Sequence, residues 1–392
     1  MINFDEVTDR RGTNSSKWDV LENELPLSTA DMDFKAAPEI IEALSKRVKH
    51  GIFGYSDVSE EWQRSLISWW KRRHHFEIKK EWLMFCTGVI PAISSSVRKI
   101  TTPAEKIVVL TPVYNIFFNS ILNNGRVALE CPLIEKDGDY EIDFEDLEKK
   151  LADPQTTMMI LCNPHNPIGK IWSRDELRRI GELCERYHVV VLSDEIHCDL
   201  TDPHEEYIPY GTVSESCLQN SIICVAPSKT FNLAGLQSAA IIVANEGLRN
   251  RINRAINTDE VAEPNAFAMD ATVAAFDRSE YWLDELRAYI FENKQRVREY
   301  IRREIKGLKV LDSKATYLLW IDCRELDIDS DTLAKYLREK TGLILSSGKI
   351  YRGDGFHYLR MNTAYPRSMI DDALKRLKTG IEMLEKETEE IK

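Results

Sequence analysis

Lys229 is a residue of this sequence whose surroundings suggest chemistry. It follows an apolar, β-branched run at residues 222–226, and Pro227 ends that run. Such a run, bounded by turn residues, predicts a short buried strand. Because a lysine at the end of a buried strand is poorly solvated, its neutral amine is favoured, and a neutral amine can form a Schiff base with an aldehyde. A lysine in a surface loop is the alternative that this stretch leaves open.

An aromatic ring, an amide, a carboxylate and an imidazole also follow predicted strands. These side chains are Tyr114 after residues 106–110, Asn166 after residues 157–162, and Asp194 and His197 after residues 189–193. Ligands bind beyond the carboxyl ends of strands in open parallel sheets, so one site could hold all of these groups together with the lysine. Simpler interpretations place Tyr114 in the core, Asn166 in a proline-bounded turn and Asp194 at a helix N-cap.

Pyridoxal phosphate is a cofactor that needs this set of groups. Its aldehyde needs a lysine, and its ring nitrogen needs a carboxylate that keeps it protonated. Its phenolate oxygen accepts a hydrogen bond that an amide can donate, and its ring stacks on an aromatic side chain. Its phosphate needs backbone N–H groups, which a helix N-terminus supplies. Gly88 follows a predicted strand at residues 83–86, and Pro91 suits the first turn of a helix, so the sequence predicts a phosphate site there.

The elements that must position these groups alternate along the chain. Apolar β-branched runs and amphipathic helical patterns follow one another from about residue 83, which predicts an α/β fold with a mainly parallel sheet. The predicted strands are residues 83–86, 106–110, 157–162, 189–193, 222–226 and 239–244. A helix over residues 173–187 has Ser173 and Glu176 spaced as a capping box. A long charged helix over residues 281–304 then leads to a second, smaller set of strands and helices.

Composition limits the class of protein. The chain has 392 residues, of which 43% are hydrophobic and 30% charged, as in an ordinary globular protein. A net charge of −12 gives no electrostatic footprint for a nucleic-acid partner. We expect no signal peptide, because the N-terminus has no basic region followed by an apolar run. We expect no membrane span, because no apolar stretch reaches about 18 residues. The eight cysteines are scattered without a CxxC pair, which favours reduced thiols and a cytoplasmic protein.

Motifs for other cofactors are weak. His74 and His75 are adjacent, so they cannot present two imidazoles on one helix face, and we predict no metal site. A GxGxxG fingerprint for a dinucleotide is absent, and residues 342–349 match a phosphate loop only loosely.

With these motifs the sequence resembles the fold-type-I pyridoxal-phosphate enzymes of the class I/II aminotransferase superfamily. The superfamily motifs are Tyr114, Asn166-Pro167-Ile168-Gly169, Asp194, Ser228-Lys229 and Arg360. Within the superfamily, it is most similar to the MalY/PatB-type carbon–sulfur β-lyase branch (cystathionine β-lyases). The branch motifs are Ala30-Asp31-Met32-Asp33-Phe34, Asn163-Pro164-His165-Asn166-Pro167, Ser193-Asp194-Glu195-Ile196-His197 and the stretch at residues 228–236.

The resemblance implies a role for each matching residue. Lys229 is implied to bind the aldehyde carbon of the cofactor, Asp194 the ring nitrogen and Asn166 the phenolate oxygen. Tyr114 is implied to stack on the ring face, and His197 to contact the cofactor as well. The implied phosphate contacts are Gly88, Val89, Ile90 and Ser228. Arg360 is implied to clamp the α-carboxylate of an amino-acid substrate, and Ala30 to lie against that substrate. Tyr55 matches a tyrosine that reaches the phosphate in the neighbouring subunit, which implies a homodimer with shared sites.

The implied fold has a mainly parallel seven-stranded sheet in a large domain, residues 46–284. A smaller α+β domain is implied for both chain ends, residues 1–45 and 285–392. The implied reaction is β-elimination of a cysteine thioether such as cystathionine to a thiol, pyruvate and ammonia. An aminotransferase would use the same cofactor motifs, and a regulatory or binding protein with this fold is a third possibility. Ser28-Thr29 stand where the branch typically has Trp-Val, so the sequence leaves the preferred thioether open.

Overall fold

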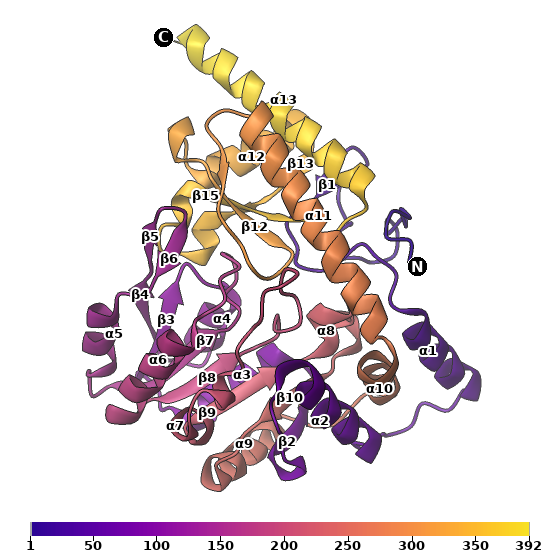
Figure 1. Ribbon diagram of the computed structural model, residues 1–392, viewed down its shortest axis with the longest axis vertical. Helices are drawn as coiled ribbons and strands as arrows, with labels where there is room; N and C mark the ends of the chain where they lie inside the picture. Colours follow the sequence, from indigo (N-terminus) through magenta and orange to yellow (C-terminus); the bar gives the residue numbers. More distant parts are fainter. Residues whose placement is uncertain (1, 392) are drawn as a thin grey trace.

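The computed structural model describes residues 2–391. Figure 1 shows a lower body built around a large sheet and an upper body that carries the C-terminal helix α13 (Arg367–Ile391). The long helix α11 (Glu280–Glu304) runs from one body to the other. No helix in this described part of the chain is long and apolar enough to cross a membrane.

The large sheet has seven strands in the order β2-β10-β9-β8-β7-β3-β4. Their bounds are β2 Leu83–Cys86, β3 Lys106–Thr111, β4 Val127–Pro132, β7 Thr156–Cys162, β8 Val190–Asp194, β9 Ser221–Val225 and β10 Ala239–Ile242. Strand β10 runs antiparallel to both of its neighbours, and the other pairs are parallel. The predicted α/β architecture with a mainly parallel seven-stranded sheet is confirmed. The sequence patterns missed β4, since this edge strand is largely exposed or half-buried and carries Glu130.

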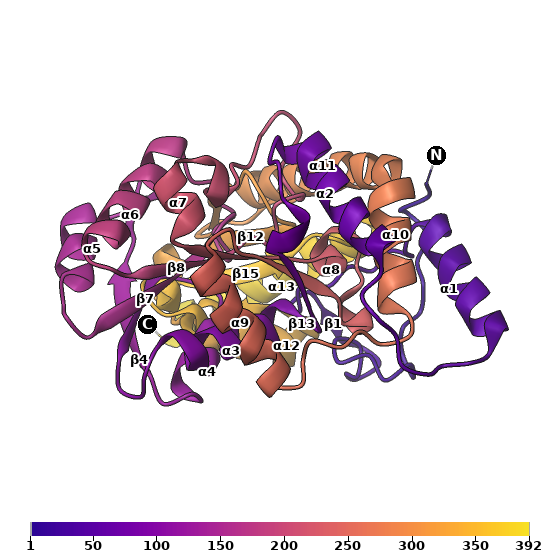
Figure 2. The same ribbon diagram turned by 90° about the horizontal axis from the view of Figure 1, so that it is seen from below.

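Helices cover both faces of the large sheet because alternate side chains of each strand point to opposite faces. Ile107 and Val109 pack with one set of helices, and Val108 and Leu110 pack with the other. Figure 2 shows the two sets on either side of the strands. The first set is α3 (Val89–Ile100), α4 (Ile116–Leu122) and α9 (Glu246–Thr258), and the second is α5 (Phe144–Leu151), α6 (Arg174–Arg186) and α7 (Glu215–Gln219). The capping box predicted for α6 is present.

A third group of helices packs beside the end of the sheet formed by β2 and β10. Helix α10 (Ala268–Arg278) contacts both α1 (Pro38–His50) and α2 (Glu60–His74). Four large side chains recur at helical spacing in α2 and are buried: Trp62, Leu66, Trp69 and Trp70. These helices anchor the connection at residues 51–59, which contains Tyr55.

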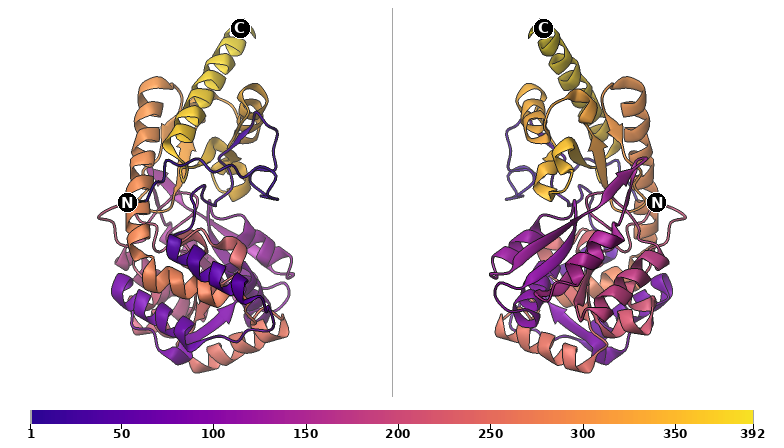
Figure 3. Two further views of the ribbon diagram at one scale, coloured as in Figure 1. Left: turned by 90° about the vertical axis from the view of Figure 1, so that its right-hand side faces the viewer. Right: turned by 90° about the vertical axis from the view of Figure 1, so that its left-hand side faces the viewer.

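The upper body is a four-stranded antiparallel sheet with the order β11-β12-β15-β14, packed against α12 (Ser330–Thr341) and α13. Its strands are β11 Lys309–Val310, β12 Leu318–Asp322, β14 Ser346–Ser347 and β15 Tyr358–Asn362. The N-terminal segment joins this body, since β1 (Leu25–Pro26) pairs in parallel with β13 (Leu343–Ile344). Figure 3 shows the indigo N-terminal segment running along the upper body. The domain division at residues 45 and 284 stays a prediction, and both positions lie inside helices, α1 and α11.

The two bodies meet closely at Gly169, after β7. Its φ of +69° is one that glycine tolerates best, and a Cβ there would clash with Ser313 Oγ and lie 2.6 Å from the Ala315 carbonyl. The Gly169 carbonyl accepts hydrogen bonds from the N–H groups of Lys314 and Ala315, both at 2.9 Å. The loop that carries Asn166 is therefore fixed against the upper body.

Short elements complete the part of the chain from residue 2 to residue 391. They are the hairpin β5 (Ile134–Lys136) with β6 (Asp139–Glu141), the one-turn helix α8 (Pro227–Thr230), and six 3₁₀ turns at Lys80–Trp82, Tyr210–Thr212, Ala234–Leu236, Arg324–Leu326, Gly348–Tyr351 and Gly355–His357.

Candidate active site

A cavity of about 220 Å³ lies at the ends of the central strands. All the predicted site residues except Tyr55 and Arg360 line it. They are Ala30, Gly88, Val89, Ile90, Tyr114, Asn166, Asp194, His197, Ser228 and Lys229. Among the other lining residues, Ile196 and Ala234 lie within the branch motifs, whereas the sequence patterns gave no role to Cys162, Gln237 and Ser238.

Lys229 projects into this cavity from α8, the single turn that follows β9. Its Nζ donates a hydrogen bond to the Ala30 carbonyl at 2.5 Å. Burial and then the positive charge of Arg360 lower the pKa of Lys229 to about 8, against the opposing charges of Asp31 and Asp194. Lys229 therefore lies in the cavity rather than in a surface loop, and a useful fraction of its amine is neutral near neutral pH.

Asp194 is the last residue of β8, and its carboxylate is buried. Burial raises its pKa to about 7, although the hydrogen bond from the Ile196 N–H (3.1 Å) and the charge of Lys229 favour the ionised form. A carboxyl group with this pKa is ready to accept a cationic partner from the cavity, because such a partner restores its charge.

Asn166 and Arg360 meet at the wall between the two bodies. Arg360 Nη1 donates to Asn166 Oδ1 at 3.2 Å, and Arg360 Nη2 donates to the Ser28 carbonyl at 2.7 Å. Because the amide oxygen of Asn166 is engaged in this way, the hydrogen-bonding group that its side chain retains is the Nδ2 donor.

Two buried nitrogens at the site have no hydrogen-bond partner among residues 2–391. They are Nε of Arg360 and Nδ1 of His197. Burial, followed by the positive charges of Lys229 and Arg360, lowers the pKa of His197 to about 3, so its imidazole is neutral. Buried polar atoms are almost always paired, and an unpaired guanidinium N–H in a cavity wall is a typical place for a ligand carboxylate.

The N-terminus of α3 forms another part of the cavity wall. Gly88 is its N-cap, and Val89 and Ile90 are its first two residues. The first N–H groups of a helix have no acceptor within the helix and carry a partial positive charge. Ser228 lines the same cavity, and its hydroxyl together with these N–H groups can bind a phosphate.

The N-terminal segment closes the cavity with its backbone. The Ala30 carbonyl accepts from Lys229 and from the Tyr317 hydroxyl, the latter at 2.9 Å. Asn362 Nδ2 donates to the Thr29 carbonyl at 2.8 Å, and the Thr29 side chain is exposed. Asn362 follows Arg360 by two residues, which is the signal that could have identified it, whereas no sequence signal marks Tyr317.

Tyr55 lies elsewhere and is fully exposed within the single chain. Two apolar neighbours, Ile52 and Phe53, are also exposed. The geometry of one chain therefore gives Tyr55 no contact with the cavity of that chain.

Asp199, a buried residue that the sequence analysis missed, anchors the turn that carries Lys229. Its carboxylate accepts from Thr230 Oγ1 at 2.9 Å and from Trp69 Nε1 at 3.0 Å, and it lies 2.8 Å from His74 Nε2. The ligand atoms of His74, Cys198 and Asp199 lie within 4.8 Å of one another, a spacing that a metal ion could use. Since both oxygens of Asp199 already bind protein groups, the cluster supports Thr230 instead.

The donor set fits pyridoxal phosphate. An amine of lowered pKa, a buried carboxyl, an amide donor, the phenol ring of Tyr114 and a helix N-terminus all line one cavity. These groups match the aldehyde, ring nitrogen, phenolate oxygen, ring face and phosphate of this cofactor, one group to each.

Comparison with known proteins agrees with this geometry. The chain is 39% identical to cystathionine β-lyase PatB of Bacillus subtilis (strain 168), over 97% of this chain and 100% of PatB. The crystal structure of cystalysin from Treponema denticola, which contains a pyridoxal 5′-phosphate cofactor, matches with a TM-score of 0.95 at 33% identity, over 98% of this chain and 100% of cystalysin.

The pyridoxal-phosphate-bound C–S lyase from Staphylococcus hominis matches with a TM-score of 0.91 at 31% identity, over 97% of this chain and 98% of that enzyme. The family described as aminotransferase class I and II matches residues 22–377. The chain therefore has the fold-type-I architecture and belongs to the aminotransferase class I and II family.

Proposed function

We propose that this protein is a pyridoxal-phosphate-dependent carbon–sulfur β-lyase. It cleaves cystathionine or a related S-substituted cysteine to a thiol, pyruvate and ammonia. The observation that carries the proposal is the meeting of Lys229, Asp194 and Asn166 in one cavity beside the unpaired Nε of Arg360. The relatives named cystathionine β-lyase and C–S lyase support the choice of reaction.

The residues of the cavity would hold the cofactor by its polar edges. Asp194 would hold the ring nitrogen, Asn166 the phenolate oxygen and Tyr114 the ring face, while Ser228 and the N-terminus of α3 would hold the phosphate. When bound, pyridoxal phosphate supplies an electrophilic carbon for the amine of the amino acid and a conjugated ring that accepts the electrons of the Cα–H bond.

Lys229 moves the proton in this proposal. Its amine accepts the Cα proton, and its pKa of about 8 suits a base that works near neutral pH. The Cβ–S bond breaks with its electron pair on sulfur, and the Lys229 ammonium can return the proton to the departing thiolate. The three-carbon enamine that is released hydrolyses to pyruvate and ammonia.

Arg360 orients the substrate in this proposal. Its unpaired Nε can donate to the α-carboxylate, while Asn166 and the Ser28 carbonyl hold the other two nitrogens of the guanidinium. A charge-assisted contact of this kind contributes roughly 1.5–3 kcal/mol and fixes the direction of the Cα–H bond.

An aminotransferase is the second candidate, because the family includes such enzymes and the same residues serve both reactions. Incubation with cystathionine in the absence of a keto-acid distinguishes the two. We expect pyruvate and a free thiol to accumulate over many turnovers. A single half-reaction that stops at the amine form of the cofactor would instead identify an aminotransferase. Parallel assays with cystine and djenkolate would rank the thioethers.

We also propose a homodimer with shared active sites, in which Tyr55 of each chain reaches the cofactor phosphate of its partner. The full exposure of Tyr55 beside exposed Ile52 and Phe53 supports this assembly. We propose a cytoplasmic location, since all eight cysteines are buried as free thiols, which suits a reducing compartment. The division into a large domain at residues 46–284 and a small domain from both chain ends completes the proposal.

A further inference from the structure

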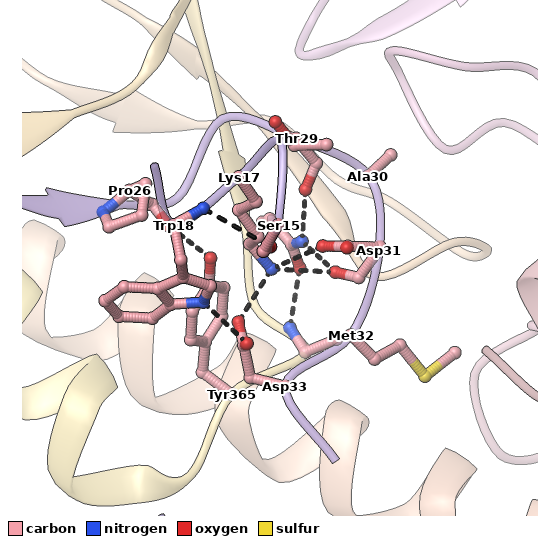
Figure 4. Close-up of polar contacts among 12 residues, drawn as sticks. Ser15, Lys17, Trp18, Pro26, Thr29, Ala30, Asp31, Met32, Asp33 and Tyr365 are labelled. Carbon is pink, nitrogen blue, oxygen red and sulfur yellow. Dashed lines mark hydrogen bonds and ion pairs between the residues drawn. The ribbon is translucent and has the colours of Figure 1, made fainter. Parts of the chain in front are cut away.

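A partly buried ion network includes Asp31 and Asp33 of the N-terminal segment that closes the cavity. Lys17 Nζ lies 2.8 Å from Asp31 Oδ1 and 2.7 Å from Asp33 Oδ2, and the Lys17 side chain is fully buried. Arg10 pairs with the same two carboxylates, at 2.8 Å in each case. Figure 4 shows Lys17 between Asp31 and Asp33. Each carboxylate therefore contacts both cations, and the four charges balance.

Further contacts fix the network in place. Lys17 Nζ also donates to the Asp31 carbonyl at 3.0 Å and lies 4.1 Å from the centre of the Tyr365 ring. Trp18 Nε1 donates to Asp33 Oδ1 at 2.8 Å, as Figure 4 shows. Removal of one member would leave an uncompensated charge in a poorly solvated place, which is strongly unfavourable.

The backbone of the same segment contacts Lys229 and Arg360. The Ala30 carbonyl accepts from Lys229, and the Ser28 carbonyl accepts from Arg360. Asn362 and Asn232 hold the adjacent backbone, at the Asp31 carbonyl (2.7 Å) and at the Met32 N–H (3.0 Å). One short segment thus contacts the ion network through Asp31 and Asp33, and contacts Lys229 and Arg360 through its Ala30 and Ser28 carbonyls.

The network also acts on Lys229 through its charges. Burial and the charge of Arg360 have the largest effects on the pKa of Lys229, and both lower it. The negative charge of Asp31 raises this pKa, and the positive charge of Lys17 lowers it. Removal of the Asp31 charge should therefore lower the pKa of the Lys229 amine, and removal of the Lys17 charge should raise it.

We propose that Arg10 and Lys17 are positioning residues for the reaction: through Asp31 and Asp33 they fix residues 28–33, so that the Ala30 carbonyl holds the Lys229 amine and the Ser28 carbonyl holds Arg360. This inference rests on the proposed function. A merely structural role, in which the network only adds stability to the N-terminal segment, is the outcome that the test must separate from it.

The test uses the full chain loaded with pyridoxal phosphate and three variants. Lys17→Met leaves one cation for two carboxylates, and Asp31→Asn leaves two cations for one carboxylate. The double variant Lys17→Met/Asp31→Asn restores the balance with the Arg10–Asp33 pair alone. Lys35→Met is the matched control, because Lys35 pairs with Glu6 on the exposed surface of the same segment, where an ion pair contributes little.

Two readouts do not depend on turnover. The first is amide hydrogen exchange over residues 28–34, which we expect to accelerate about tenfold or more in either single variant. The second is the pH midpoint of the visible absorbance of the bound cofactor. We expect Lys17→Met to raise this midpoint and Asp31→Asn to lower it, because the first removes a positive charge near Lys229 and the second removes a negative one. The double variant should return towards the wild type in both readouts.

The kinetic readout is the value of kcat for the elimination, which we expect to fall about 10- to 100-fold in each single variant because the reacting amine is misplaced. Lower thermal stability with unchanged exchange, unchanged midpoint and unchanged kcat would overturn the proposal. If Lys17→Met does not fold, Asp31→Asn and the double variant carry the same test. If the wild type lacks lyase activity, the proposed function fails, whereas exchange and absorbance still decide the positioning role.

Discussion

Nη1 of Arg360 lies 3.2 Å from Oδ1 of Asn166, although the two residues are 194 positions apart in the chain. Arg360 comes from β15 in the upper body, and Asn166 follows β7 in the lower body. The contact joins the group that would bind the substrate carboxylate to the group that would bind the cofactor. The relative placement of the two bodies therefore sets the geometry of the site.

Arg360→Lys is expected to weaken substrate binding. A lysine has one compact ammonium group in place of the planar fork, so it cannot contact Asn166, the Ser28 carbonyl and a carboxylate together. We expect kcat/KM for cystathionine to fall about 10- to 100-fold, mainly through KM, with the cofactor absorbance retained. Arg352→Lys, at a half-exposed pair with Glu130, is the control that should keep wild-type kinetics. An unchanged KM in Arg360→Lys would contradict the carboxylate clamp.

Lys229→Ala is expected to remove both the visible absorbance of the bound cofactor and the activity. The variant lacks the amine that would attach the cofactor and accept the Cα proton, so we expect at least about a 10³-fold loss of kcat. Mass spectrometry after borohydride reduction should find the cofactor attached to the wild type and to the Lys35→Ala control. A borohydride-reducible adduct on the Lys229→Ala protein would show that another residue carries the cofactor.

Asp194→Asn is expected to change how the stability of the cofactor-free protein depends on pH. Burial raises the pKa of Asp194 to about 7, so between its unfolded value near 4 and pH 7 the folded protein binds the extra proton. The free energy of unfolding that Asp194 contributes therefore falls as pH rises through this window, by on the order of 4 kcal/mol. An asparagine does not ionise, so the free energy of unfolding of Asp194→Asn lacks this decrease. The variant should therefore be more stable than the wild type at pH 8 and similarly stable at pH 4.

The wild type must be compared with Asp194→Asn because buried histidines change the free energy of unfolding in the opposite direction, making the protein more stable as pH rises. Burial lowers the pKa of His165 to about 4 and that of His197 to about 3, so their contributions to stability are lost as pH falls below about 6.5. Chemical denaturation of both proteins across pH 4–8 would measure the difference directly. An equal slope in the two proteins would show that Asp194 stays ionised, contrary to the expectation. With the cofactor bound, the stabilising effect of the substitution should disappear.

At a cofactor concentration too low to load Tyr55→Ala by itself, mixing the Tyr55→Ala and Lys229→Ala variants is expected to restore activity if the sites are shared between subunits. A Tyr55→Ala chain keeps Lys229, and a Lys229→Ala chain keeps Tyr55, so one of the two sites in a mixed dimer is intact. Random exchange of equal amounts should recover about a quarter of the wild-type activity, because half of the dimers are mixed and each has one good site. Subunit exchange would be followed by native mass spectrometry.

Tyr55→Ala alone tests the same arrangement through cofactor affinity. We expect a weaker affinity for pyridoxal phosphate with unchanged thermal stability of the cofactor-free protein, because the side chain is fully exposed in the single chain. A Leu21→Ala variant, at another exposed side chain, is the control. Failure of the mixed sample to regain activity despite proven exchange would contradict the shared site.

The sequence determined the large sheet and the groups at its strand ends. Residues 157–162 and 222–226 are continuous apolar runs, as expected of strands buried on both faces, and such runs mark their own ends. The positions of Asn166, Asp194 and Lys229 follow from those ends, because parallel strands bring them to one edge. Strand β4 was not predicted, because an edge strand needs no continuous apolar run.

Only the tertiary structure decided how the N-terminal segment and Arg360 complete the site. Lys17 has no partner that a local pattern could reveal, since its burial depends on Asp31, Asp33 and Tyr365 meeting around it. The contact between Lys229 and the Ala30 carbonyl joins residues 199 positions apart. Periodicity encodes which face of an element is buried, whereas contacts between distant segments depend on how two bodies pack, and local patterns do not carry that information.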